Sequence, residues 1–99
     1  MSFCVETDEA AGEVILYLGG TLGREALEAL RDAVESMKGA ARRLVLDVQN
    51  VTRIDTCGLG MLLIARESTE DPRPAIRGAS QDFVRTLRLF RFGMLFELE

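Results

Sequence analysis

The 99-residue sequence contains no histidine, and this absence excludes several kinds of active site. Without an imidazole there can be no Ser-His-Asp or Cys-His catalysis and no histidine-bound metal ion. The two cysteines, Cys4 and Cys57, cannot supply a four-thiolate zinc site by themselves. We therefore expect a protein that is not an enzyme and has no metal site and no cofactor of its own.

Long hydrophobic runs are also missing. No apolar run approaches the roughly 20 residues of a membrane span, so direct membrane insertion is not expected. The N-terminus, Met1-Ser2-Phe3-Cys4, has neither the basic nor the apolar region of a signal peptide. The sequence thus predicts a cytoplasmic protein whose Cys4 and Cys57 are free thiols in a reducing environment.

Basic residues are outnumbered by acidic ones. Twelve lysines and arginines face 16 aspartates and glutamates, which gives a formal charge of −4 and a pI near 4.9. Proteins that bind nucleic acid usually have a basic pI and a basic face, so this balance argues against such a partner. All the basic residues except Lys38 are arginine, which pairs well with carboxylates at interfaces and favours a protein partner.

The length corresponds to one domain over residues 1–99. Segments with the apolar period of a strand alternate with segments of helical period. Parallel strands joined by helices, after one N-terminal hairpin, predict an α/β fold with the order β-β-α-β-α-β-α-β. Its small mixed sheet is mostly parallel, with one antiparallel N-terminal strand, and helices pack against it. The expected strands are 3–7, 13–18, 44–46, 75–76 and 94–98, and the expected helices are 24–37, 58–67 and 81–91.

Glycines and caps set the expected boundaries of these elements. Residues 9–12 are expected to form the hairpin loop, and Gly19-Gly20 to end the second strand. Ser80 is the expected cap of the last helix, which Gly93 ends. The side chains of that helix expected to point inward are Phe83, Val84, Leu87 and Phe90.

The segment from Leu44 to Glu67 carries the most information about function. A buried strand ends at Asp47, and a loop that closes with residues 54–58 leads into an apolar helix. Thr56 is expected at the N-cap, with its hydroxyl beside unpaired backbone amides. Because this helix has no acidic residue in its first turn, its positive end could accept a phosphate on Thr56. The alternative is that Asp and Thr here are ordinary helix caps.

The same helix is apolar on two sides. We expect Leu59, Leu62 and Leu63 to face the sheet, which places Met61, Ile64 and Ala65 on the opposite side. Methionine adapts to irregular contacts, so this outer face is a candidate surface for a partner. Alternatively, a loop or a neighbouring helix covers it.

This segment resembles the signature of STAS domains, the family of bacterial anti-sigma factor antagonists. A buried strand that ends in Asp is followed by Val and by an Ile-Asp-Ser/Thr-x-Gly-Leu-Gly run that opens a helix. The resemblance covers almost the whole chain, although Gly23 stands where an acid usually follows Gly-x-Leu. The matching residues are Gly20-Thr21-Leu22, Leu46-Asp47, Val51, Ile54-Asp55-Thr56-Cys57-Gly58-Leu59-Gly60 and the closing pattern Ser80…Val84-Arg85…Leu87…Phe96.

The resemblance implies a phosphoprotein of transcription regulation and signal transduction. In such antagonists a partner kinase, the anti-sigma factor, phosphorylates the residue after the motif aspartate, and a phosphatase removes the phosphate. The unphosphorylated form binds the partner and the phosphorylated form releases it. Carried over, the acceptor is Thr56, and ATP belongs to the kinase. The implied partner-binding residues are Asp55, Thr56, Cys57, Gly58, Leu59, Gly60, Met61 and Ile64.

Two other functions stay open at this point. The run Arg53-Ile54-Asp55-Thr56-x-Gly-Leu also resembles small STAS subunits bound to the ATPase of lipid-transport ABC complexes, where it would dock permanently. An enzyme is the other possibility, because Cys57 at a helix N-terminus could act as a nucleophile. The chain has no histidine to serve as its base, and a small buried thiol is the more common role.

Two further features have competing interpretations. A two-component receiver domain needs a late lysine, and Lys38 is the only lysine, so Asp47 is interpreted as a carboxylate that closes a loop. Arg85, Arg88 and Arg91 form a stripe on the last helix. Such stripes are usually solvated faces, and the alternative is a contact for an acidic partner.

Overall fold

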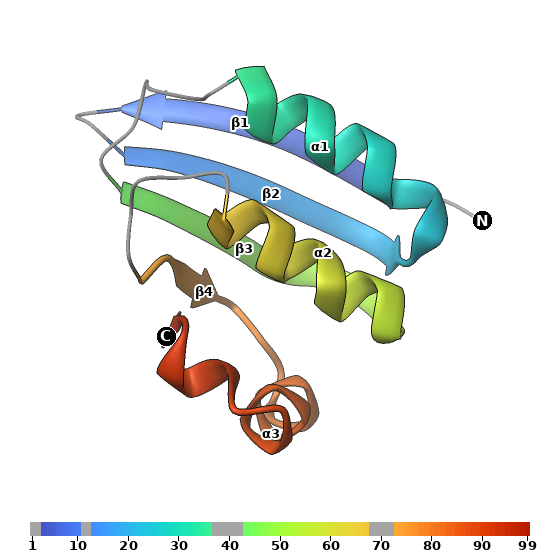
Figure 1. Ribbon diagram of the computed structural model, residues 1–99, viewed down its shortest axis with the longest axis vertical. Coiled ribbons are helices and arrows are strands. Elements are labelled where there is room, and N and C mark those ends of the chain that lie inside the picture. The colour runs from blue at the N-terminus through green and yellow to red at the C-terminus, as the bar shows by residue number, and fades with distance from the viewer. Residues whose placement is uncertain (1–2, 11–12, 37–42, 68–72) are drawn as a thin grey trace.

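The computed structural model of the protein describes residues 3–10, 13–36, 43–67 and 73–99, and its elements follow the predicted order (Figure 1). Short 3-10 helices precede α1 and follow α3. The strands are β1 (Phe3–Ala10), β2 (Glu13–Leu22), β3 (Arg43–Ile54), β4 (Ala75–Arg77) and β5 (Glu97–Leu98), and the helices are η1 (Arg24–Ala26), α1 (Leu27–Ser36), α2 (Thr56–Glu67), α3 (Gln81–Leu89) and η2 (Phe92–Met94).

The five strands form one sheet in the order β1-β2-β3-β4-β5. β1 is antiparallel to β2, and every other neighbouring pair is parallel. Parallel neighbours need a crossover, and successive right-handed crossovers in one direction leave their helices on the same face of the sheet. Accordingly, α1 and α2 lie side by side over one face (Figure 1). The predicted mixed α/β fold is confirmed.

The hydrophobic core lies between the sheet and the helices. Side chains alternate along β2, so that Val14, Leu16 and Leu18 are buried while Ile15 and Tyr17 are partly exposed. Burial of one such side chain contributes about 1.5–3 kcal/mol to folding. The core is completed by side chains from the other elements, including Leu22, Leu30, Leu44, Leu46, Val48, Leu62, Ala65, Ile76, Leu87 and Phe96.

Strand β3 is much longer than the three residues predicted for it and continues to Ile54. Its register against β2 shifts twice, and each shift adds one residue to β3. After Val48, the residues that pack against the core are therefore Val51 and Ile54, which are three positions apart. Bulges of this kind remove the period of two by which a strand is recognised in a sequence. The prediction of a loop here is wrong for that reason.

The other strand boundaries differ in similar ways. β2 does not end at Gly19-Gly20 but runs on to Leu22, and Gly20 takes the positive φ of 75° that glycine permits. Glu9 and Ala10, expected in the hairpin loop, belong to β1. Residues 11–12 and the predicted end of the first helix at residue 37 lie outside the described residues.

The last helix begins as predicted. The Ser80 hydroxyl caps α3 by accepting a hydrogen bond of 3.1 Å from the backbone N–H of Phe83. Phe83 and Leu87 are buried and Val84 is partly buried, in agreement with the expected inward face. The helix therefore presents its apolar side to the core.

The end of α3 departs from the prediction. The helix stops at Leu89, and Arg91 adopts a left-handed conformation with φ of 61°, so Gly93 is not what ends it. Phe90, predicted to point inward, is 55% exposed. Its expected place is taken by Phe92, which is buried and stacks on Phe96 with ring centroids 5.5 Å apart. The predicted strand over 94–98 is consequently reduced to Glu97–Leu98.

Candidate functional site

A single residue, Asp55, connects β3 to α2 and is held by three hydrogen bonds. Its N–H donates to the Leu22 carbonyl oxygen over 3.3 Å, and its own carbonyl oxygen accepts from the Leu59 N–H over 3.0 Å. Its Oδ1 accepts from the Gly58 N–H over 2.9 Å. The N-cap of α2 is therefore Asp55, and the prediction that Thr56 caps the helix is wrong by one position.

Thr56 is the first residue of α2, and its side chain is exposed. Within the part of the chain that the structure describes, its hydroxyl forms no hydrogen bond, because Asp55 provides the cap. The first turn of α2 carries no acidic residue, as expected from the sequence. A negative charge added at this hydroxyl would thus meet the positive end of the helix dipole, where the capping carboxylate of Asp55 already accepts from the Gly58 N–H.

The two glycines of the motif differ in their surroundings. A Cβ at Gly58 would collide with the carbonyl oxygen of Leu22 and lie 2.6 Å from Cγ1 of Ile54. A Cβ at Gly60 would meet nothing within 4 Å. Gly58 therefore allows the start of α2 to pack closely on the ends of β2 and β3, whereas Gly60 leaves the helix surface open.

The predicted partner surface is only partly at the surface. Met61 and Ala65 were expected on the outer face of α2, but they are 1% and 0% exposed and belong to the core. The reason is that α2 packs against α1 as well as against the sheet, so it has two buried sides. Of the eight predicted residues, Asp55, Thr56 and Cys57 are exposed, Gly60 and Ile64 are partly exposed, and Gly58, Leu59 and Met61 are buried.

Cys57 is a free cysteine with an exposed side chain at the second position of α2. The interpretation that it is a small buried thiol is therefore wrong. Its side chain is exposed next to that of Thr56, which is also exposed. Among the described residues, no group of three or more potential ligands is arranged to hold a metal ion.

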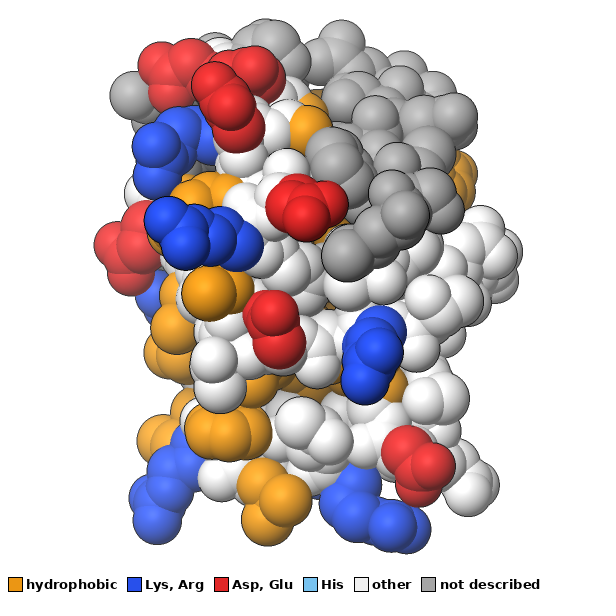
Figure 2. Space-filling view, turned by 90° about the vertical axis from the view of Figure 1, so that its right-hand side faces the viewer, with side chains coloured by type: hydrophobic (Ala, Val, Ile, Leu, Met, Phe, Trp, Pro, Cys, Tyr) orange, Lys and Arg blue, Asp and Glu red, His pale blue; other side chains and the backbone are white. Residues whose placement is uncertain are grey.

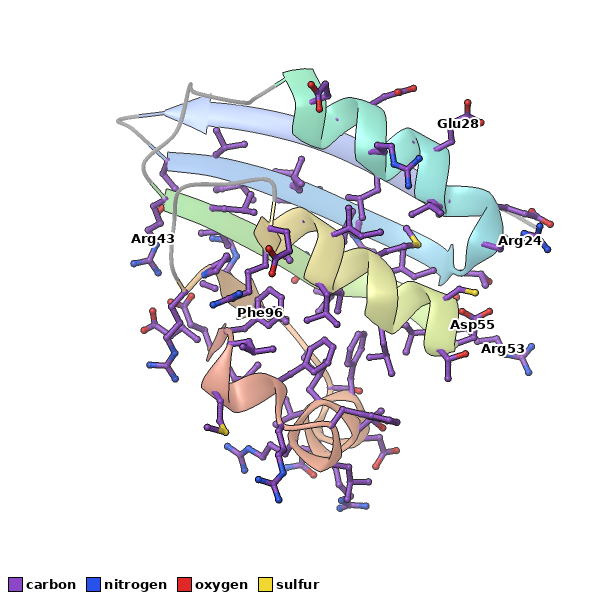
Figure 3. All side chains as sticks on the ribbon, in the orientation of Figure 1. Arg24, Glu28, Arg43, Arg53, Asp55 and Phe96 are labelled. Atoms are coloured by element: carbon purple, nitrogen blue, oxygen red, sulfur yellow. The ribbon has the colours of Figure 1, made fainter. Side chains whose placement is uncertain are left out.

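A pocket of about 420 Å³ lies beside the start of α2. Arg24 and Arg53 belong to its lining and lie at the same edge of the molecule as Asp55 (Figure 3). Neither arginine forms an ion pair with another described residue. Sequence analysis did not place Arg24 at the site, because η1 is brought there only by the fold. The lining residues are Thr21, Gly23, Arg24, Glu25, Arg53, Ile54 and Asp55.

Gly23 lies beside the capping residue Asp55, in the lining of the same pocket. A Cβ at this position would lie 2.9 Å from Oδ2 of Asp55, so the missing side chain leaves room for the capping carboxylate. Figure 2 views this end of the molecule and shows charged side chains of both signs among hydrophobic ones. The departure from the STAS signature noted at Gly23 is thus located at the site itself.

Asp47 lies inside β3 rather than at its end, and its interpretation as a loop-closing carboxylate is wrong. It is 6% exposed, and Nε and Nη2 of Arg77 both donate to its Oδ2 over 3.1 Å. Its Oδ1 accepts from the N–H of Gln49 over 3.1 Å, which pairs a backbone group inside the first bulge. The hydrogen bond to Asp47 also raises the pKa of Arg77. This ion pair supports the bent end of β3 that leads to Asp55.

A match to a model of a known protein family identifies the family of this chain. The family model described as "Mlab, STAS domain" matches residues 5–97. The chain belongs to the STAS domain family. A curated STAS-domain containing protein of Pseudomonas aeruginosa is 30% identical to this STAS domain over 88 residues, which cover 87% of each chain.

Solved structures share the STAS fold described above. An anti-sigma factor antagonist from Mycobacterium paratuberculosis has a TM-score of 0.79 and 20% identity, over 98% of this chain and 85% of that one. The Bacillus cell fate determinant SpoIIAA in its phosphorylated form has a TM-score of 0.68 and 15% identity, over 97% and 91% of the two chains. Among the residues that the structure describes, no helix is long and apolar enough to cross a membrane.

Replacing Asp55 with alanine is expected to destabilise this STAS domain by about 1 kcal/mol, because the Gly58 N–H loses its acceptor. Asparagine keeps an oxygen in the same place and caps helices about as well as aspartate, so Asp55→Asn is the matched control. Urea denaturation of both variants measures the difference. Equal stability of the two variants would contradict the role of Oδ1 as the cap.

Proposed function

We propose that this STAS domain is an anti-sigma factor antagonist-like regulator, which binds a protein partner at the start of α2 and is switched by phosphorylation of Thr56. The observation that carries the proposal is the position of Thr56, exposed at the first turn of α2 directly after the anchored Asp55. Two solved proteins of the same fold support it: one is named an anti-sigma factor antagonist and one is in a phosphorylated form.

The proposed switch acts through charge at an interface. A partner kinase transfers the terminal phosphoryl group of ATP to Oγ1 of Thr56, the hydroxyl loses its proton and ADP leaves. A partner phosphatase reverses this by hydrolysis, which releases inorganic phosphate. The phosphate adds a charge of about −1.5 to −2. In an interface it weakens binding through like-charge repulsion and through the cost of its own desolvation. A loss of about 2–4 kcal/mol weakens binding roughly 30- to 1000-fold.

The test is a pull-down from the native host with the tagged wild type and with Thr56→Glu, followed by mass spectrometry and a binding titration of the partner. We expect a kinase-type anti-sigma factor or a response-regulator phosphatase to bind the wild type, and Thr56→Glu to weaken it about 30-fold or more. Thr52→Glu is the matched control, because Thr52 is also an exposed threonine at this end of the molecule but precedes the cap. Equal binding of Thr56→Glu and wild type would contradict the switch.

A second candidate is permanent docking on the ATPase of a lipid-transport ABC complex. It is supported by the threonine at position 56 within Arg53-Ile54-Asp55-Thr56-x-Gly-Leu, the run that resembles such subunits. In that case an ABC ATPase dominates the pull-down, and co-purification does not depend on the phosphorylation state. Neither function places a catalytic step on this chain.

A further inference from the structure

Three large hydrophobic side chains are exposed at the carboxyl end of α3 and in η2. Leu89 is 77% exposed, Phe90 55% and Met94 75%. Single exposed hydrophobic residues are ordinary, but several on one short segment indicate an interaction site. The turn at Arg91 creates the arrangement, because it buries Phe92 and leaves Phe90 outside. The apolar side chains are thus a consequence of how the segment folds.

The same segment is basic within an acidic protein. Residues 81–94 contain Arg85, Arg88 and Arg91 against one acid, Asp82, so they carry a net charge of +2 in a chain of −4. All three arginines are exposed. Arg85 lies 3.7 Å from Asp82 in an exposed pair, which contributes little. Arg88 and Arg91 form no ion pair with the other residues that the structure describes.

A pocket lies beside these exposed apolar and basic residues, along α3. It has a volume of about 510 Å³, and it is lined by Ala79, Gln81, Val84, Arg85, Arg88 and Leu89. Three of these side chains are apolar and two are guanidinium groups. The lower part of Figure 2 shows hydrophobic and basic side chains next to each other at the α3 end of the molecule. A ligand that carries both an apolar group and a carboxylate would therefore contact the apolar side chains with the first and pair with a guanidinium group through the second.

We propose that Arg85, Arg88, Leu89, Phe90, Arg91 and Met94, here called the α3–η2 surface, bind an acidic amphipathic segment of a partner protein. A hydrophobic side chain of that segment enters the pocket, and its carboxylates pair with Arg85 and Arg88. Charge complementarity selects this occupant, because a basic segment would meet three arginines. A lipid bilayer fits less well, since the remainder of the chain carries −6 and is repelled by anionic headgroups. The surface is separate from the proposed function at Thr56.

The test titrates the isotopically labelled full chain with a synthetic helical peptide of glutamate and leucine and follows amide chemical shifts. We expect the shifts to be confined to residues 79–94, and the Arg85→Gln/Arg88→Gln double variant to weaken binding at least about tenfold. Arg31→Gln, an exposed arginine of α1, is the matched control and should leave the affinity unchanged. The amide spectrum of each variant also confirms that it is folded.

Two further ligands make the result decisive. A peptide with serine in place of leucine should bind at least about fivefold more weakly, because it cannot fill the pocket. Vesicles of phosphatidylcholine with one quarter phosphatidylglycerol should cause neither shifts nor loss of amide signal intensity. The proposal is overturned if the glutamate-leucine peptide does not bind at about 1 mM, if it shifts residues elsewhere, if the serine peptide binds equally well, or if only the vesicles bind.

Discussion

Replacing Gly58 with alanine is expected to destabilise the domain by about 3 kcal/mol or more. The added Cβ would collide with the carbonyl oxygen of Leu22, a backbone atom at the end of β2. That oxygen also accepts the hydrogen bond from the Asp55 N–H. Relief of the collision therefore requires α2 to move away from the sheet and strains the hydrogen bond that anchors its cap.

Gly60→Ala is the control for this prediction. The same substitution two residues later meets no atom within 4 Å, so only the helix preference for alanine remains. That preference stabilises a helix by about 0.5–1 kcal/mol. Urea denaturation of the two variants should give changes of opposite sign. If Gly58→Ala lies within about 0.5 kcal/mol of the wild type, α2 is not packed on Leu22 as described.

Replacing Arg77 with methionine is expected to destabilise the domain by about 3 kcal/mol, because it leaves the carboxylate of Asp47 buried without its cation. The Asp47 side chain is 8% exposed and that of Arg77 is 38% exposed, so water reaches the guanidinium but scarcely the carboxylate. Arg43→Met is the matched control. Arg43 pairs with Glu13, Glu97 and Glu99, but all of these side chains are at least one third exposed. Exposed pairs contribute about 0–1 kcal/mol, so this variant should change little.

A second substitution separates charge from packing. Asp47→Asn keeps an oxygen for the Gln49 N–H but removes the negative charge. Added to Arg77→Met, it should recover about half or more of the lost stability, as a double-mutant cycle would show. If the double variant is no more stable than Arg77→Met alone, the loss comes from packing of the arginine stem and not from the unpaired carboxylate.

The sequence was sufficient to predict the order of elements and the mixed sheet, because the apolar period of each segment is a local property. Ser80 could be identified as a cap, since the hydroxyl and the amide it binds are three residues apart. The full length of β3 could not be predicted. Its bulges put Val51 and Ile54 on the core side three residues apart, which lacks the strand period of two, so only the pairing with β2 defines the strand.

The sequence located the segment of the candidate site correctly but not the residue that caps α2 or the burial of every side chain. The segment that matters was found from Asp55 to Gly60, but both Asp55 and Thr56 can cap a helix, and only the hydrogen bond to Gly58 decides between them. Met61 was misplaced because helical period shows that a helix has two apolar sides without showing which is covered. Phe90 was misplaced for a related reason, since the turn at Arg91 is not visible in the spacing.

The one-residue connection at Asp55 has a consequence for the speed of recognition. Its N–H, its carbonyl oxygen and its carboxylate are each bonded to a different partner, so there is no slack chain between the sheet and the exposed first turn of α2. A protein that docks there meets a surface already in its final shape and need not wait for a loop to order. Association should then proceed in one step, at about 10⁵–10⁷ M⁻¹s⁻¹. Differences in affinity between partners would then arise from the dissociation rate of each complex.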